Sequence, residues 1–166
     1  MFTTLQVVTL VLVAFTMAPA VAHALEYPGK LRLSKDAYMT VQRIYYPGFT
    51  MAGVVELVSV ISALALVVLT PRDSPAFALS LAALLLLVAM HAVYWTVTAP
   101  VNKVWLKDEQ LSKAGAAFFR TDTGSGKSQE ADWKHLRDRW EYSHIARAVL
   151  VTVALGSLAC AVALSD

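Results

Sequence analysis

The segment Pro75–Thr98 reads PAFALSLAALLLLVAMHAVYWTVT, and it decides the fold class. Its only charged or imidazole side chain is His91. A membrane-spanning helix needs about 20 mostly apolar residues, because each residue adds about 1.5 Å across a hydrocarbon layer about 30 Å thick. Lipid offers the backbone no hydrogen-bond partners, so an apolar segment of this length is expected to be helical. The segment therefore predicts a transmembrane helix.

Three more segments have the same character, and they cover about residues 5–24, 49–70 and 144–164. The first of these spans is interrupted by His23 and the second by Glu56, and the last contains Arg147 near its start, after His144. The first span imitates a secretory signal because small residues follow its apolar run, but the lack of a basic start favours its retention. We predict an all-α integral membrane four-helix bundle that forms a single four-span domain over residues 1–166.

Composition supports this fold class. Apolar and aromatic residues make up 57% of the chain and charged residues only 16%, against roughly a quarter charged in soluble domains. These values exclude an ordinary soluble domain and a disordered chain. The net charge of +2 is too small to suggest a nucleic-acid partner. Small residues permit close helix contacts within or between chains, so the sequence leaves a homo-oligomer open.

The basic residues predict the orientation. All but one of the 14 lie in or beside two segments, 25–48 and 99–143, and the exception is Arg72 in the link between spans two and three. By the positive-inside rule, both segments are cytoplasmic loops and both termini lie outside. The expected location is a bacterial inner membrane, with the lipid bilayer as the constant partner.

The loops also carry local signals. Ser34 is expected to cap a short helix with Tyr38, Val41 and Tyr45 on one side. The sequence Pro28-Gly29 is expected to end the first span. A last helix is expected to start near Ser128 and to continue into span four. Gly126-Lys127-Ser128 is not a phosphate-binding loop, because the required earlier glycine is Thr121 and no strand precedes it.

Ionisable groups within a membrane are costly, so each is a candidate functional residue. Glu56 and His91 each lie seven residues inside the cytoplasmic end of a span, which places both about 10 Å below that surface. His23 and Glu26 end span one, and His144 begins span four, on the same side. Each span thus offers His or Glu in its cytoplasmic half, which predicts a functional site there.

Several types of chemistry suit these groups. A four-helix bundle can bind metal, here iron or copper, through inward His and Glu side chains. Histidines on separate helices can instead clamp a haem, and the same groups can move protons with no cofactor. The structural alternative is that Glu56 and His91 only bond one another or a nearby aromatic residue. It is stronger for His23 and His144, which are expected near headgroups and water. The candidate metal ligands are His23, Glu26, Glu56, His91 and His144.

A second set of residues precedes span four. Spacings of four, three, four and three put Trp133, Arg137, Trp140, His144 and Arg147 on one helical stripe. Anchoring at the interface explains the start of this stripe. It explains Arg147 less well, because that guanidinium enters the apolar zone and needs a partner, for which Glu56 or Glu26 is the candidate. A further buried polar candidate, Asn102, closes span three.

Four stretches of this chain together resemble the anthrone-oxygenase-like family of small four-span membrane proteins. They are EYPGKL from Glu26, QRIYYPGF from Gln42, TAPVN from Thr98, and the stripe from Trp133 to Arg147. The resemblance implies a four-helix membrane bundle and oxidation of a polycyclic aromatic substrate by oxygen. It points to Asn102, Trp140, His144 and Arg147 as site residues, with Trp140 against a bound cofactor. The two Pro-Gly segments indicate a bacterial subgroup rather than a polyketide-pathway enzyme.

We therefore expect a membrane oxidoreductase of oxygenase type that acts on a hydrophobic small molecule. Glu56 and His91 would be base or ligands, and His144 a second acid, base or ligand. Arg147 and Asn102 would orient an oxyanion. The first alternative is an accessory protein that docks a partner through loop 99–143, using the aromatic residues Trp105, Phe118, Phe119 and Trp133. The second alternative is a small proton-coupled transporter.

Overall fold

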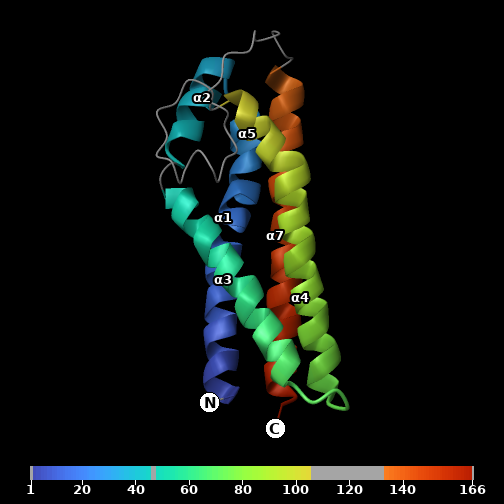
Figure 1. Cartoon of the computed structure of the whole chain (residues 1–166). Coiled ribbons are helices and arrows are strands. Elements are labelled where there is room, and N and C mark those ends of the chain that lie inside the picture. Colours follow the sequence, from blue (N-terminus) through green and yellow to red (C-terminus); the bar gives the residue numbers. More distant parts are fainter. Residues whose placement is uncertain (1, 46–47, 106–132, 166) are drawn as a thin grey trace.

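The structure is a computed structural model that describes residues 2–45, 48–105 and 133–165. Within this part the chain is helical and contains no strand (Figure 1), which confirms the all-α prediction. The elements in chain order are α1 (Phe2–Lys30), α2 (Lys35–Arg43), α3 (Gly48–Leu69), α4 (Pro75–Val93), the π-helical segment η1 (Tyr94–Thr98), α5 (Ala99–Trp105) and α7 (Trp133–Ala163).

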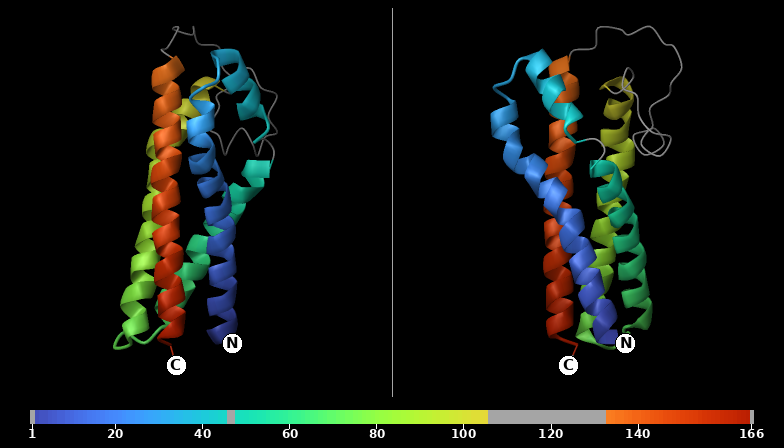
Figure 2. Two further views of the ribbon diagram at one scale, coloured as in Figure 1. Left: turned by 180° about the vertical axis from the view of Figure 1, so that it is seen from behind. Right: turned by 90° about the vertical axis from the view of Figure 1, so that its left-hand side faces the viewer.

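Four helical segments in the described part are long and apolar enough to cross a membrane, as predicted. They are Phe2–Lys30, Met51–Leu69, Pro75–Trp105 and Trp133–Ala163. Both termini and the link between α3 and α4 lie at one end of the bundle, which we call the termini end (Figures 1 and 2). Helix α2 and the start of α7 lie at the opposite end, which we call the loop end. This arrangement is that of an integral membrane bundle.

The bundle core follows a spacing of three and four residues. On α1 the buried positions include Gln6, Thr9, Val13, Thr16 and Ala20, which form one seam. Such spacing is typical of left-handed helix packing in membranes. Helix α7 packs against α1 and α4, and α1 packs against α3, which crosses the bundle obliquely in Figure 1.

Hydroxyl groups join α1 to α3 in the half near the termini end. The hydroxyls of Thr9 and Ser62 lie 2.6 Å apart, and that of Thr16 donates to Ser59 over 3.4 Å. Around them lies an apolar core that includes Val13, Leu66, Leu87, Val151 and Leu158. This half is therefore held together by packing and hydroxyl pairs, and the buried ionisable groups of the described residues lie elsewhere.

Two helices continue past the ends that the sequence predicts. Helix α1 does not stop before Pro28-Gly29 but runs to Lys30, whose buried side chain is fixed by ion pairs. The third span does not stop at Thr98 but continues through η1 to Trp105. Pro100 offers no N–H to the carbonyl of Thr96, and Arg139 donates to that carbonyl over 3.4 Å. Both Pro28 and Pro100 therefore lie inside helices, and tertiary contacts are made beside each of them.

The predicted short helix is confirmed. Ser34 caps α2, because its hydroxyl accepts the backbone N–H of Ala37 over 3.4 Å. The expected start of the last helix near Ser128, like Gly126-Lys127-Ser128, lies outside the described residues. Described α7 begins at Trp133.

Candidate functional site

An ion pair between α3 and α7 lies at the centre of the site. Glu56 Oε1 accepts from Arg147 Nη2 over 2.6 Å. His91 of α4 joins them, with Nε2 at 4.0 Å from Glu56 Oε2. Glu56 and Arg147 are only 6% and 5% exposed. Glu56 is therefore the partner that the sequence analysis required for Arg147, and the predicted proximity of Glu56 and His91 is present, although 4.0 Å is too long for a direct hydrogen bond.

Not every hydrogen-bond donor of Arg147 is used. Its guanidinium carbon lies 5.2 Å from the centre of the Tyr94 ring. Its buried Nε has no hydrogen-bond partner among the residues that the structure describes. An unpaired buried donor on a charged group is costly. Arg147 Nε is thus suited to bind an acceptor oxygen of a ligand.

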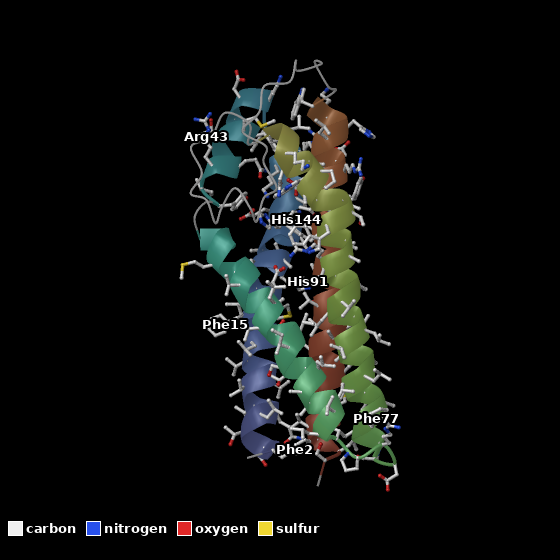
Figure 3. The ribbon with its side chains drawn as sticks, viewed as in Figure 1. Phe2, Phe15, Arg43, Phe77, His91 and His144 are labelled. Carbon is white, nitrogen blue, oxygen red and sulfur yellow. The ribbon has the colours of Figure 1, made fainter. Side chains whose placement is uncertain are left out.

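Two imidazoles have their tautomers fixed in the same way. His91 Nδ1 lies 3.0 Å from the carbonyl of Leu87, and His144 Nδ1 lies 2.9 Å from the carbonyl of Trp140. A carbonyl only accepts hydrogen bonds, so each Nδ1 carries a proton. In the neutral ring the lone pair is then on Nε2. Both residues therefore carry an acceptor lone pair on Nε2. In Figure 3, His144 lies toward the loop end and His91 nearer the middle of the bundle.

His23 of α1 belongs to a neighbouring group. Its Nδ1 lies 3.2 Å from Lys30 Nζ, and its ring centre is 4.4 Å from those of His144 and Tyr45. His23 is 2% and His144 5% exposed. The expectation that water reaches these two histidines is therefore wrong, because they pack against one another and against the rings of Tyr45 and Trp140.

Lys30 is the buried cation of this second group. Its Nζ lies 3.0 Å from Glu26 Oε2 and 3.6 Å from Glu141 Oε1. It also lies 4.9 Å from the ring centre of Tyr45 and 5.1 Å from that of Trp140. Two carboxylates and two aromatic faces therefore compensate for the loss of water around the ammonium group.

Two tyrosines attach the α2 region to the bundle. Tyr38 donates to Glu141 over 2.7 Å, and Tyr45 donates to Glu26 over 2.5 Å. Burial raises the pKa of Tyr38 well above its usual value, and the nearby Glu141 carboxylate raises it further. Burial and the bond to Glu26 likewise raise the pKa of Tyr45. Both phenols therefore stay protonated and keep donating across the ordinary pH range.

Replacing Tyr38 by phenylalanine should destabilise the fold by about 1–3 kcal/mol, because fully buried Glu141 would lose its hydroxyl donor. Denaturant unfolding in detergent, followed by tryptophan fluorescence, measures the change. Tyr142→Phe is the matched control, because that tyrosine is 60% exposed on the same end of α7. Equal stability of the two variants would show that the Tyr38–Glu141 bond does not hold α2 in place.

Asn102 and Trp140 position the imidazole of His144. Trp140 Nε1 donates to Asn102 Oδ1 over 2.9 Å, and the Trp140 and His144 rings are 3.9 Å apart between centres. In the structure Asn102 thus supports Trp140. Its predicted role toward an oxyanion remains a prediction. Ser143 adds a contact to η1 through Thr98, at 2.8 Å between hydroxyls.

The five candidate metal ligands do not form a metal centre in this structure. Among the described residues, no three or more His, Cys, Asp or Glu side chains are grouped so as to hold a metal ion. The carboxylates of Glu56 and Glu26 instead form ion pairs with Arg147 and Lys30, respectively. The rings of His23 and His144 touch edge to face, which leaves no room for a porphyrin between those two residues.

An apolar groove lies beside the site, between α1 and α3. Its volume is about 600 Å³, and the residues lining it are Phe15, Ala18, Pro19, Ile44, Gly48, Met51, Ala52, Val54 and Val55. Pro19 precedes His23 by one helical turn, and Ala52 precedes Glu56 by the same interval. The groove therefore lies within about one helical turn of both buried residues, although neither of them lines it.

Fold and site together define a four-span membrane protein with a buried Glu–Arg–His site near the middle of its long helices. Residues 42–157 match the anthrone oxygenase family, and the chain belongs to that family. No curated protein and no solved structure matches the chain. The matched range contains Glu56, His91 and Arg147, whereas His23 and Lys30 precede it.

The sequence analysis missed Lys30 and Glu141, although both had a signal. Lys30 lies seven residues after His23, which is two turns along the same helical face. Glu141 lies three residues before His144, beside the stripe that was recognised. Both residues lie just outside the predicted spans, because the first span was predicted to end at residue 24 and the fourth to begin at residue 144.

Proposed function

We propose that this protein is an oxygenase that oxidises an activated methylene group of a hydrophobic polycyclic aromatic molecule. The observation that carries the proposal is the buried set of Glu56, Arg147 and His91, which combines a base with an open cationic donor. Membership of the anthrone oxygenase family supports the reaction class. The substrate in the family's name is a ring ketone with an acidic methylene group opposite its carbonyl.

His91 is the proposed base. With a proton on Nδ1, its Nε2 can accept one from the methylene carbon, and the nearby Glu56 carboxylate stabilises the imidazolium that results. The electron pair left on carbon delocalises onto the carbonyl oxygen as an enolate. Arg147 Nε–H is the proposed donor to that oxygen. A positioned base contributes about 10²–10⁴-fold to the rate.

Oxygen chemistry completes the proposed reaction. The enolate carbon adds dioxygen, and the peroxide anion that forms takes the first proton back from His91 to become a hydroperoxide. His91 then accepts the second methylene proton as the O–O bond breaks. One oxygen atom stays on carbon as the new carbonyl, and the other leaves as hydroxide. His144 is the proposed acid that converts this hydroxide to water. In the net reaction, one methylene group and one dioxygen molecule give one ketone group and one water molecule. This reaction balances without an external reductant.

The apolar groove is the proposed entry from the bilayer. Ala18→Phe places a large side chain at an exposed position that lines the groove, and should raise KM at least tenfold for a polycyclic substrate. Ala92→Phe is the matched control, because that alanine is also exposed but lies on α4, outside the groove. Steady-state rates in nanodiscs measure both. Equal KM values in the two variants would mean that substrate enters by another route.

Oxygen uptake by the purified protein with an anthrone tests the proposal as a whole. The protein should consume one dioxygen per quinone formed, at a rate well above the spontaneous oxidation measured without protein. A rate no higher than that background, for every ring ketone tried, would contradict the oxygenase proposal. Co-purification of a stoichiometric partner in that case would favour the accessory-protein alternative.

A further inference from the structure

The shortest polar contacts connect Glu26 to Lys30 and Lys30 to His23, whose ring contacts His144, and we call this series the line. Glu26 Oε2 also lies 3.7 Å from His23 Nδ1. We propose that Glu26, Lys30 and His23 are a proton relay that carries protons from the loop-end surface to His144. The use of such a relay in turnover rests on the proposed function, in which His144 acts as an acid. The existence of the relay can be tested without any substrate.

The outer part of the line consists of short polar contacts. The Glu26 side chain is 43% exposed, whereas Lys30 and His23 are 4% and 3% exposed. Glu26 Oε2 lies 3.0 Å from Lys30 Nζ, which lies 3.2 Å from His23 Nδ1. The contacts therefore lead from a carboxylate in reach of water to an imidazole that is closed off from it.

In the inner part of the line, the two histidines carry their protons on different ring nitrogens. Lys30 Nζ only donates, so His23 Nδ1 accepts and the proton of that ring is on Nε2. His144 has the opposite tautomer, with its proton on Nδ1 and its lone pair on Nε2. The two rings contact at 4.4 Å between centres. The ring that carries its proton on Nε2 is thus in edge-to-face contact with the ring that carries its lone pair on Nε2.

The proposed transfer is a single concerted shift. A proton from water enters at Glu26, Lys30 passes one proton to His23 Nδ1, and His23 passes its Nε2 proton to His144 Nε2. Glu26 ends as a carboxylate and Lys30 as an ammonium, as before the shift. His144 becomes an imidazolium, and His23 has changed tautomer. Return of His23 to its first tautomer readies the line for another proton.

A purely structural role explains only part of this arrangement. Glu26 and Glu141 balance the charge of Lys30, and the rings of Tyr45 and Trp140 cover it. None of these contacts requires a basic nitrogen as the further neighbour of the ammonium group. The placement of the His23 imidazole there, in contact with a second imidazole, is what a relay requires.

Lys30→Arg separates the two roles. Arginine keeps the positive charge for Glu26 and Glu141, but a guanidinium does not give up its proton in proteins. In protein labelled with ¹⁵N-histidine, exchange of the His23 Nε2 proton with solvent deuterium should be at least tenfold slower in Lys30→Arg than in the unmodified chain. Lys103→Arg, at an exposed position on α5, should exchange at the original rate.

Exchange in Lys30→Arg as fast as in the unmodified chain would overturn the relay. Glu26→Gln gives a second test that does not alter Lys30 and should slow exchange similarly, and unchanged exchange there would also count against it. The Trp140 indole N–H resonance reports whether each variant keeps the native packing. During turnover, Lys30→Arg should lower kcat, and added imidazolium should restore part of it. Exchange that is slowed in both variants, together with no oxygen uptake by the unmodified chain, would support the relay and contradict only the oxygenase proposal.

Discussion

Arg147→Met should destabilise the bundle by about 3–5 kcal/mol and abolish oxygen uptake. The substitution removes the only short ion-pair partner of Glu56 in the described part of the chain and leaves a carboxylate buried at 6% exposure. Loss of one partner from a buried ion pair carries this cost, because the remaining charge has no water to replace it. Denaturant titration in detergent measures the stability, and an oxygen electrode measures the activity.

The double variant Glu56→Gln with Arg147→Met separates stability from chemistry. It removes both charges, so most of the lost stability should return, since neutral replacements of a buried pair are often tolerated. Activity should stay absent because the open donor on Arg147 is still missing. A double variant as unstable as Arg147→Met would mean that the ion pair is not the source of the destabilisation. Recovered activity would remove Arg147 from the site.

His91→Gln should lower kcat by at least about 100-fold while stability changes by less than about 1 kcal/mol. Glutamine is similar in length and polar, but it has no basic nitrogen, and a positioned base is worth about 10²–10⁴-fold. Single-turnover rates of product formation under saturating oxygen measure the effect on the chemical step. His135→Gln is the matched control, because that histidine is exposed near the start of α7.

One result would change the assignment of the base. His144 has the same fixed tautomer as His91, through its bond to the carbonyl of Trp140. Full activity of His91→Gln, together with loss of activity in His144→Gln, would mean that His144 is the base. Equal rates in both variants and in the unmodified chain would mean that neither imidazole takes part.

The fold was largely predictable because a membrane imposes a simple rule. Each long apolar segment must satisfy its own backbone, so length and composition were enough to locate all four spans. Their ends were less predictable. Pro28 and Pro100 lie inside helices because Lys30 is fixed by carboxylates and the carbonyl of Thr96 is bonded by Arg139. Local signals contain no information about such distant partners.

The inner site was also predictable in outline. Depth counted along two helices placed Glu56 level with His91, and the need of Arg147 for an anion pointed to Glu56, which is its partner in the structure. In the second group, His23, Glu26 and His144 were predicted as candidates, but Lys30 and Glu141 were not. The burial of Lys30 depends on Glu141 and on α2 folding back over the bundle end, and no spacing along a single helix reveals that arrangement.

The reaction that we propose for this buried site oxidises the methylene group of a ring ketone with dioxygen. Turnover of an anthrone under ¹⁸O₂ by the protein in nanodiscs, followed by mass spectrometry of product and water, tests it most directly. We expect one labelled atom in the new carbonyl and one in water. Formation of labelled product should fall to the protein-free background in Arg147→Met and by at least about 100-fold in His91→Gln. Product without label, or labelling that both variants leave unchanged, would contradict the claim.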